Sequence, residues 1–354
     1  MELELTDVIS QFSNEPVVDI QLLGNGHIHK TWKVDFASHS IVLQQFNSNI
    51  FKNPYEVCKN IEIISDHLKS KNDYPYDILQ LIRSKQNEFI VPFENNYFRA
   101  INFAENCYAA DIMDSVSTAF EVSKAFGKFA KALSDLNPNS LTYSIENFHN
   151  GTLRHAALWT AIKENIADRV KYCENLINKI ETHKEITKKI DSLKETQKIP
   201  LRIAHYDTKV NNILLDNSTH LPKMIIDLDT TMPGTLLSDF GDMVRTATPT
   251  KDENEMDLDM VNFDLKFFEG ITHGYLSELS STLNQHEKEN LLEGGKYLIL
   301  MQCERFLADY LNGDIYYTIN YENQNLVRAN NQMKLLESIV DQETAANQIL
   351  KKYW

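Results

Sequence analysis

Short apolar runs separated by polar turns fill the first hundred residues, a pattern that predicts β-strands. The runs expected to form strands cover residues 17–23, 31–36, 40–46, 78–82, 89–92 and 97–103. Residues 54–68 interrupt them, because their apolar positions recur every three to four residues and so follow the period of a helix. We therefore expect a small lobe of strands that contains one helix.

A helical period dominates from about residue 106 onwards. It continues through residues 153–195, where Ile166 is expected on the buried face. Short β runs return at 199–230, and residues 255–350 are helical again. Strands followed by helices with a second short β region predict an α+β protein.

Charge limits the partners that this chain can bind. Its 50 acidic and 35 basic residues give a formal net charge of −15. Such a field repels nucleic acid and anionic membranes, because binding either requires Lys and Arg to neutralise phosphates. We expect no nucleic-acid or membrane partner, and a polyanionic substrate would need a metal ion or a local basic pocket.

Several common motifs are missing from the sequence. The four cysteines are scattered without a CxxC pair, and the glycines form neither a GxxxxGK[ST] loop nor a GxGxxG fingerprint. The N-terminal residues lack the features of a signal peptide, and no apolar run reaches the roughly 18–20 residues that span a bilayer. We expect a soluble cytoplasmic protein.

Polar residues in the stretch 199–230 stand where apolar runs end. Two short runs joined by a turn-rich loop predict a β-hairpin, with Asn212 at its start and Asp227 at its end. Their amide and carboxylate oxygens would meet at one edge and suit Mg²⁺, which keeps water and phosphate oxygens as its other ligands. Asp207, on the preceding loop, could orient a substrate hydroxyl and accept its proton during phosphoryl transfer.

The spacing His-x-Asp-x₄-Asn at 205–212, followed by an aspartate at a strand end, matches the catalytic arrangement of kinases. The chain resembles the aminoglycoside phosphotransferase and choline kinase superfamily and, within it, the N-acetylhexosamine 1-kinases. The matching stretches follow the family's order over nearly the whole chain: NGHIHKTW (25–32), VLQQFNSNIF (42–51), NFHN (147–150), HYDTKVNNILLD (205–216), IDLDTTMPG (226–234), DFGDMVR (239–245), VNFDLKFFEG (261–270) and RFLADYLNGDIYY (305–317).

The resemblance implies a bilobal protein-kinase-like fold. A β-rich N-lobe over residues 1–105 would cover the nucleotide, and a mainly helical C-lobe over 106–354 would carry the catalytic loop, the metal site and sugar-binding helices. The implied reaction is ATP- and Mg²⁺-dependent phosphoryl transfer to a small sugar. The expected acceptor is the anomeric hydroxyl of an N-acetylhexosamine.

The resemblance also implies roles for individual residues. Asp207 would be the catalytic base, which also contacts the substrate, and Asn212 and Asp227 would bind Mg²⁺. His205 would brace the catalytic loop. Asp229 lies two residues past Asp227, so on a strand it would share its face and support the metal site, contact the sugar or serve a simple turn.

The triplet Asp239-Phe240-Gly241 imitates the metal-binding motif of protein kinases. It lies beyond the strand end at Asp227, and the equivalent aspartate of the superfamily braces the catalytic loop. We therefore expect Asp227, and not Asp239, to bind the metal.

The resemblance places Gly24, Asn25 and Gly26 in a turn that covers the nucleotide phosphates, since glycines let a backbone approach phosphate closely. An ordinary hairpin turn is the alternative. The backbone at 101–107 would pair with adenine.

The third strand departs from the kinase pattern. Kinases usually carry Lys or Arg there, but this chain has Gln44, which donates hydrogen bonds without bringing charge. Lys30, Lys33 or Mg²⁺ itself would then hold the phosphates.

Arg305 and Tyr316 are the expected sugar contacts on the substrate side. Arg offers a rigid fork of donors, and Tyr can stack on a sugar or donate to it. Without the resemblance, an Arg305–Asp309 pair one helical turn apart would be favoured. Two other functions remain open: a kinase of another sugar, inositol, choline or an aminoglycoside, and a non-catalytic pseudokinase, which the missing third-strand cation would favour.

Overall fold

In the computed structural model, which describes residues 2–23 and 28–354, the chain forms two compact units. Unit 1 contains Met1–Ala110, Ala132–Glu146 and Asn212–Pro233. Unit 2 contains Asp111–Lys131, Asn147–Asn211 and Gly234–Trp354. The lobe boundary expected after residue 105 stays a prediction.

A six-stranded antiparallel sheet dominates unit 1, in the order β1-β2-β3-β6-β4, with β5 also paired to β6. Its strands are β1 (Val17–Leu22), β2 (Lys30–Phe36), β3 (Ser40–Gln45), β4 (Leu81–Ile82), β5 (Val91–Phe93) and β6 (Asn96–Asn102). The apolar runs of the sequence therefore predicted all six strands. Two runs differ in length, since only the last two residues of 78–82 and of 89–92 form strand.

Two helices complete this part of unit 1. Helix α1 (Glu2–Ile9) was not expected, and its buried residues Val8 and Ile9 join the core under the sheet. Helix α2 (Pro54–Lys69) was expected, and it buries its apolar face along its whole length. It begins after Asn53, whose side chain accepts the N–H of Glu56 at 3.4 Å.

The predicted hairpin forms a second, three-stranded sheet in unit 1. Strand β9 (Ile213–Asp216) pairs with β10 (Pro222–Ile225) on one side and with β7 (Cys107–Ala109) on the other. Strand β7 stands where the sequence predicted helix. Because these residues pair with β9, the next helix, α3, begins only at Val116.

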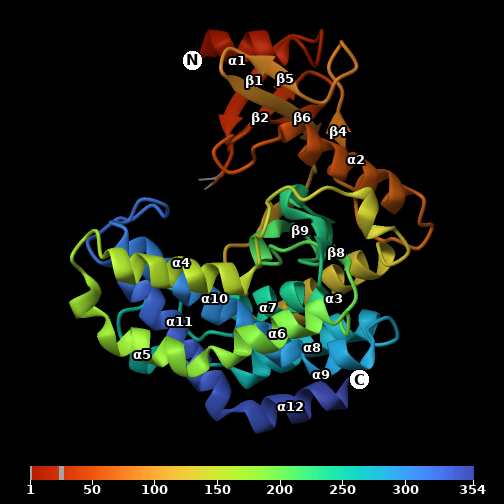
Figure 1. Ribbon diagram of the computed structural model, residues 1–354. Coiled ribbons are helices and arrows are strands. Elements are labelled where there is room, and N and C mark those ends of the chain that lie inside the picture. The colour runs from red at the N-terminus through yellow and green to blue at the C-terminus, as the bar shows by residue number, and fades with distance from the viewer. Residues whose placement is uncertain (1, 24–27) are drawn as a thin grey trace. The chain divides into compact units, whose positions relative to one another are not determined.

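Unit 2 is mainly helical (Figure 1). Its helices are α3 (Val116–Ala132), α4 (Gly151–Glu164), α5 (Glu174–His183), α6 (Glu185–Glu195), α7 (Leu236–Ala247), α8 (Leu265–Leu279), α9 (Gln285–Glu289), α10 (Leu291–Leu311), α11 (Gln324–Asp341) and α12 (Glu343–Lys352). Helix α10 is buried along nearly its whole length and packs against α4, α7 and α11. Strand β8 (Arg202–Ala204) also belongs to unit 2, whereas β11 (Met232–Gly234) begins in the last residues of unit 1.

Glycines allow α7 and α10 to approach closely. A Cβ on Gly241 would lie 2.5 Å from the carbonyl oxygen of Gly294, and a Cβ on Gly294 would lie 2.6 Å from that of Leu237. Neither position therefore tolerates a larger side chain without a backbone shift. This contact sets the position of the α7 carboxylates described below.

One expected core residue is on the surface. Ile166 is 70% exposed. Helix α4 ends at Glu164, and Asn165 takes a left-handed backbone conformation with φ 43°. The helical period seen in the sequence is therefore broken just before Ile166.

All four cysteines are free thiols. Within the part of the chain that the structure describes, no helix combines the length and apolarity that crossing a bilayer requires.

Candidate active site

Asn212 and Asp227 lie at the same end of the β9–β10 hairpin, opposite its turn. Ile225 pairs with Ile213 across the hairpin. The N–H of Ile226 donates to the carbonyl oxygen of Asn212 at 3.0 Å. Asp227 follows in a left-handed conformation with φ 58°, which is uncommon outside glycine and often marks a functional site. The structure thus brings the two expected metal ligands to one edge.

Asp229 is enclosed by unit 1. It is 1% exposed, and its carboxylate lies 2.6 Å from Nε2 of His29 and 2.7 Å from Nη2 of Arg99. The N–H of Asn47 donates to Nδ1 of His29 at 3.1 Å, so Nε2 carries the proton that His29 donates to Asp229. Of the three roles considered for Asp229, this enclosure fits support of the Asp227 turn.

The Asp229–Arg99 pair is ionised in neutral solution. Burial opposes ionisation of Asp229, yet Arg99 and His29 hold the pKa of this carboxyl below its usual range. Burial also opposes the charge on Arg99, but Asp229, with further contributions from Cys58 and Asp227, raises the pKa of the guanidinium. The pair therefore ties β6 to the turn that follows β10.

Arg99 also places a cation beside the position where the third-strand lysine is missing. It stands directly opposite Gln44 in the β3–β6 register, and its Nε donates to Oε1 of Gln44 at 2.8 Å. The replacement by Lys30, Lys33 or Mg²⁺ that the sequence led us to expect stays a prediction, and Arg99 was not considered. The available signal was a single arginine inside the apolar run that forms β6.

The turn expected at Gly24, Asn25 and Gly26 lies outside the described residues. His29 follows it in the sequence and is the residue that donates to Asp229. The adenine contact expected at 101–107 stays a prediction.

In unit 2, strand β8 leads into the loop that carries Asp207. The ring of His205 is fully buried and lies edge-on to Phe126 at 5.4 Å and Phe129 at 5.9 Å. Nδ1 of His205 accepts the N–H of Asp207 at 3.3 Å. These contacts match the bracing role implied for His205.

Asp239 holds the same loop from α7. It is 2% exposed and accepts the N–H groups of His205 at 3.0 Å and Tyr206 at 2.8 Å, while its carbonyl accepts the Thr208 hydroxyl at 2.6 Å. Burial raises the pKa of Asp239 to about 7, and the two N–H donors oppose that rise. Asp239 therefore braces the loop, as the sequence predicted.

Asp207 is partly exposed and lies among charged neighbours of its own unit. Its carboxylate is 2.9 Å from Nζ of Lys209. On α7, Arg245 donates from Nε and Nη2 to Asp242 at 3.1 and 2.7 Å. Burial raises the pKa of Asp242, Arg245 lowers it and the Asp207 charge raises it further, so Asp207 is close enough to act on this pair.

Arg305 and Tyr316 come from α10 and the loop that follows it. Arg305 donates to Oε1 of Gln302 at 3.0 Å, and its guanidinium lies 5.8 Å from the centre of the Tyr316 ring. The alternative Arg305–Asp309 pair does not form. Asp309 instead accepts the N–H groups of Ile315 and Tyr316 at 3.0 and 2.8 Å, so it shapes the loop that presents Tyr316, which is 62% exposed.

An aromatic and basic group beside the catalytic loop was missed, although the sequence marked NFHN (147–150). The His149 ring stacks on Phe148 at 4.6 Å and meets Tyr206 edge-on at 4.8 Å. Burial, and then the charges of four cations, lower the pKa of His149: Arg305, Lys194, Arg245 and Arg154. A neutral imidazole in cationic surroundings therefore lies against the residue before Asp207.

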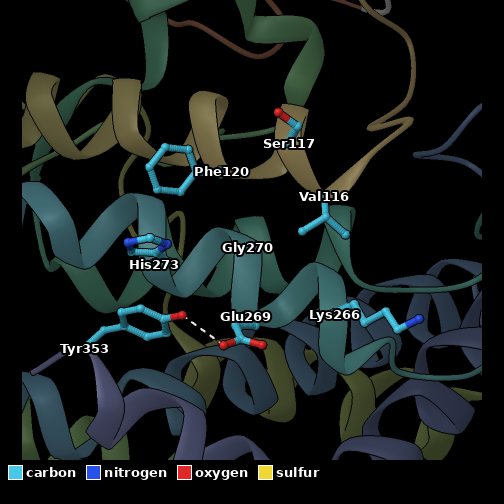
Figure 2. A pocket seen from close by; sticks show the side chains of 8 residues that line it. All are labelled: Val116, Ser117, Phe120, Lys266, Glu269, Gly270, His273 and Tyr353. Atoms are coloured by element: carbon cyan, nitrogen blue, oxygen red, sulfur yellow. Dashed lines mark hydrogen bonds between the residues drawn. The ribbon is translucent and has the colours of Figure 1, made fainter.

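The pocket in Figure 2 lies elsewhere in unit 2, between α3, α8 and the C-terminal residues after α12. Its volume is about 440 Å³. Tyr353 donates to Glu269 at 2.9 Å and stacks on His273 at 4.5 Å. None of the expected site residues lines this pocket.

Comparison with known proteins gives the family. The sequence profile of the phosphotransferase enzyme family, APH, matches residues 20–272. A microcompartment-associated aminopropanol kinase is 14% identical, with 99% of this chain and 100% of that chain covered and a TM-score of 0.61. Spectinomycin phosphotransferase, in complex with ADP and spectinomycin, is 13% identical, with 98% of each chain covered and a TM-score of 0.59. Ethanolamine kinase of Plasmodium vivax is 15% identical, with 92% and 85% covered and a TM-score of 0.53.

The profile covers well over half of the chain, so the chain belongs to the phosphotransferase enzyme family. It is therefore a phosphotransferase, and the superfamily resemblance is confirmed. The α+β kinase-like fold, with a β-rich N-terminal part and a larger helical part, is confirmed as well. The names of the similar structures mention aminopropanol, spectinomycin and ethanolamine.

Proposed function

We propose that this phosphotransferase moves the γ-phosphate of ATP to a hydroxyl of a small sugar. The proposed acceptor is the anomeric hydroxyl of an N-acetylhexosamine, and the product is the sugar 1-phosphate. Asp207 orients this hydroxyl and accepts its proton. Arg305 and Tyr316 contact the sugar through the guanidinium fork and the phenol.

Asn212 and Asp227 are proposed to hold Mg²⁺. Their oxygen donors suit this ion, and they stand at one end of one hairpin. Among the described residues, no three His, Cys, Asp or Glu side chains gather in a way that could hold a metal ion. Mg²⁺ needs no such cluster when phosphate oxygens and water complete its shell, and when bound it would neutralise charge on the phosphates.

The positive charges around the catalytic loop are the observation that supports a sugar as the acceptor. Lys209 pairs with Asp207, and Arg154, Arg245 and Arg305 all act on His149. An ammonium group would meet like charges here. Hydroxyl groups and an amide carbonyl would instead accept hydrogen bonds from the guanidinium groups.

An acceptor panel tests the proposal. ADP release with ATP and Mg²⁺ is measured with N-acetylglucosamine, N-acetylgalactosamine, glucosamine, inositol, choline, ethanolamine and an aminoglycoside. We expect turnover with the N-acetylhexosamines and a phosphorus NMR signal coupled to the anomeric proton. Faster turnover of an amine acceptor, or phosphate on another hydroxyl, would contradict the proposed acceptor.

A second candidate is a kinase of amino alcohols or aminoglycosides. The net charge of −15 attracts cations over the whole molecule, and the similar structures are named for such acceptors. The same panel separates the two, because the candidates differ in the charge of the best acceptor. If no acceptor of either kind causes ATP consumption, the pseudokinase alternative is left.

A further inference from the structure

We propose that Arg154 and Arg305 form an anion-binding subsite, so that the acceptor sugar carries an acidic group, a carboxylate or a phosphate. This inference rests on the proposed sugar kinase function and adds the charge of the substrate to it. It concerns residues of unit 2 alone.

Helices α4 and α10 bring the two arginines together. They pack against each other, and Nδ1 of His155 lies 2.6 Å from Oε1 of Glu304 where they meet. Arg154 precedes His155 and Arg305 follows Glu304 in the sequence. The two guanidinium groups are close enough that, after burial, the Arg305 charge is the largest factor that lowers the pKa of Arg154.

Neither guanidinium has a carboxylate partner among the described residues. Arg154 donates to the carbonyl of Phe148 at 3.3 Å, and its buried Nε has no hydrogen-bond partner. Arg305 donates to the neutral side chain of Gln302.

Other arginines of unit 2 are paired. Arg202 forms a two-point contact with Glu287 at 2.6 and 2.7 Å, Arg245 binds Asp242, and Arg169 binds Asp314. In these three cases, a carboxylate lies beside an arginine whose role is structural. Two half-buried positive charges without a carboxylate partner destabilise the folded protein. An anion bound to both guanidinium groups would remove the repulsion between them.

The arginine pair borders the catalytic loop. The Phe148 residue that accepts from Arg154 stacks on His149, and its ring centre lies 6.0 Å from that of Tyr206, the neighbour of Asp207. His149 adds a buried Nδ1 that has no hydrogen-bond partner. An acidic group bound at Arg154 and Arg305 would therefore sit beside a sugar whose hydroxyl reaches Asp207.

Matched acceptors test the charge of the substrate. We compare kcat/KM for N-acetylglucosamine, its 3-O-lactyl ether, which adds a carboxylate, and its 6-phosphate. We expect one of the two acidic sugars to exceed the neutral sugar at least tenfold. In Arg154→Met and Arg305→Met, this ratio should fall at least tenfold, and Arg154→Lys should keep part of it because it keeps the charge without the fork. Lys163→Gln, an exposed change on the same helix, should leave the ratio unchanged.

Calorimetric titration of the acidic and neutral sugars without nucleotide gives a second measurement that does not need turnover. Tighter binding of an acidic sugar than of the neutral sugar supports the subsite if the difference is lost in Arg154→Met. Comparison of the 3-O-lactyl ether with the 6-phosphate shows whether the subsite binds a carboxylate or a phosphate. Equal or weaker binding of both acidic sugars, or a preference that survives Arg154→Met in a protein with unchanged melting temperature, overturns it. If only the neutral sugar is turned over, the subsite is overturned and the proposed function stands. If no sugar is turned over, the proposed function is overturned, and the titration alone then decides whether the subsite binds an acidic sugar.

Discussion

Among single residues, Asp229 joins three separate segments of unit 1. It connects His29, next to the expected nucleotide turn, with Arg99 on β6, and it lies two residues beyond Asp227. A buried carboxylate with two charged or donating partners fixes all three segments at once. We therefore expect Asp229 to position the turn that carries Asp227.

Asp229→Asn should lower the free energy of unfolding by about 3–5 kcal/mol near neutral pH, because it leaves the buried Arg99 charge unpaired. The pKa of Asp229 is lowered in the folded protein, so its stabilisation is complete above the unfolded value near 4 and is lost as the pH falls through the folded value. The difference in the free energy of unfolding between wild type and Asp229→Asn, measured by urea titration, should thus become smaller below about pH 4. Asp73→Asn, a change at an exposed aspartate, is the control. If the difference in unfolding free energy for Asp229→Asn stays constant down to pH 2, ionisation of Asp229 does not contribute to stability.

Asp207→Asn should reduce kcat at least a hundredfold with the true acceptor, because an amide cannot accept the hydroxyl proton. The melting temperature should stay within a few degrees of wild type, since Asp207 is partly exposed. Rates from ADP release and melting curves check both statements. A variant with near-normal kcat would rule out Asp207 as the base.

At the scale of elements, two aspartates with different surroundings have different expected roles. Asp227 follows β10 at the end of the hairpin opposite its turn, and Asp239, inside α7, accepts two backbone N–H groups of the catalytic loop. Only the first is expected to touch a metal ion.

Magnesium titration separates the roles of these two aspartates. Chelation should abolish activity, and Asp227→Asn should raise the Mg²⁺ concentration for half-maximal rate at least tenfold, because one charged ligand is lost. Asp239→Asn should leave this midpoint unchanged but lower the melting temperature and kcat, since an amide nitrogen would face a backbone N–H. The reverse result would move the metal site to Asp239.

The close approach of α7 and α10 predicts sensitivity to a single methyl group. Gly241→Ala would place a Cβ 2.5 Å from a backbone oxygen and should cost about 1–3 kcal/mol in urea unfolding. Gly295→Ala is the matched comparison, because its Cβ would meet a side-chain methyl of Val244 at 2.9 Å and not a backbone oxygen. Equal losses for the two would show that backbone contact is not the cause.

For the whole molecule, the parts that follow local periodicity could be predicted from the sequence. The six strands of the large sheet, helix α2 and the hairpin between Asn212 and Asp227 all follow from apolar spacing and turn residues. The catalytic segment could be found because its polar residues stand at the ends of apolar runs.

The contacts that no local pattern encodes could not be predicted. Arg99 meets Gln44 only through the strand order of the sheet, and Arg154 meets Arg305 only through the packing of α4 on α10. Strand β7 was missed for the same reason, because its partner β9 lies a hundred residues away. Distant pairing decides these positions, and one sequence carries no record of it.

The exchange of a third-strand lysine for the Gln44–Arg99 pair has a practical consequence for chemical labelling. Reactive nucleotide analogues that acylate the conserved amine of kinases would find an amide and a guanidinium here, and neither is an effective nucleophile at neutral pH. Surveys of cell extracts that detect kinases by such tagging should therefore pass over this enzyme at that position, however active it is.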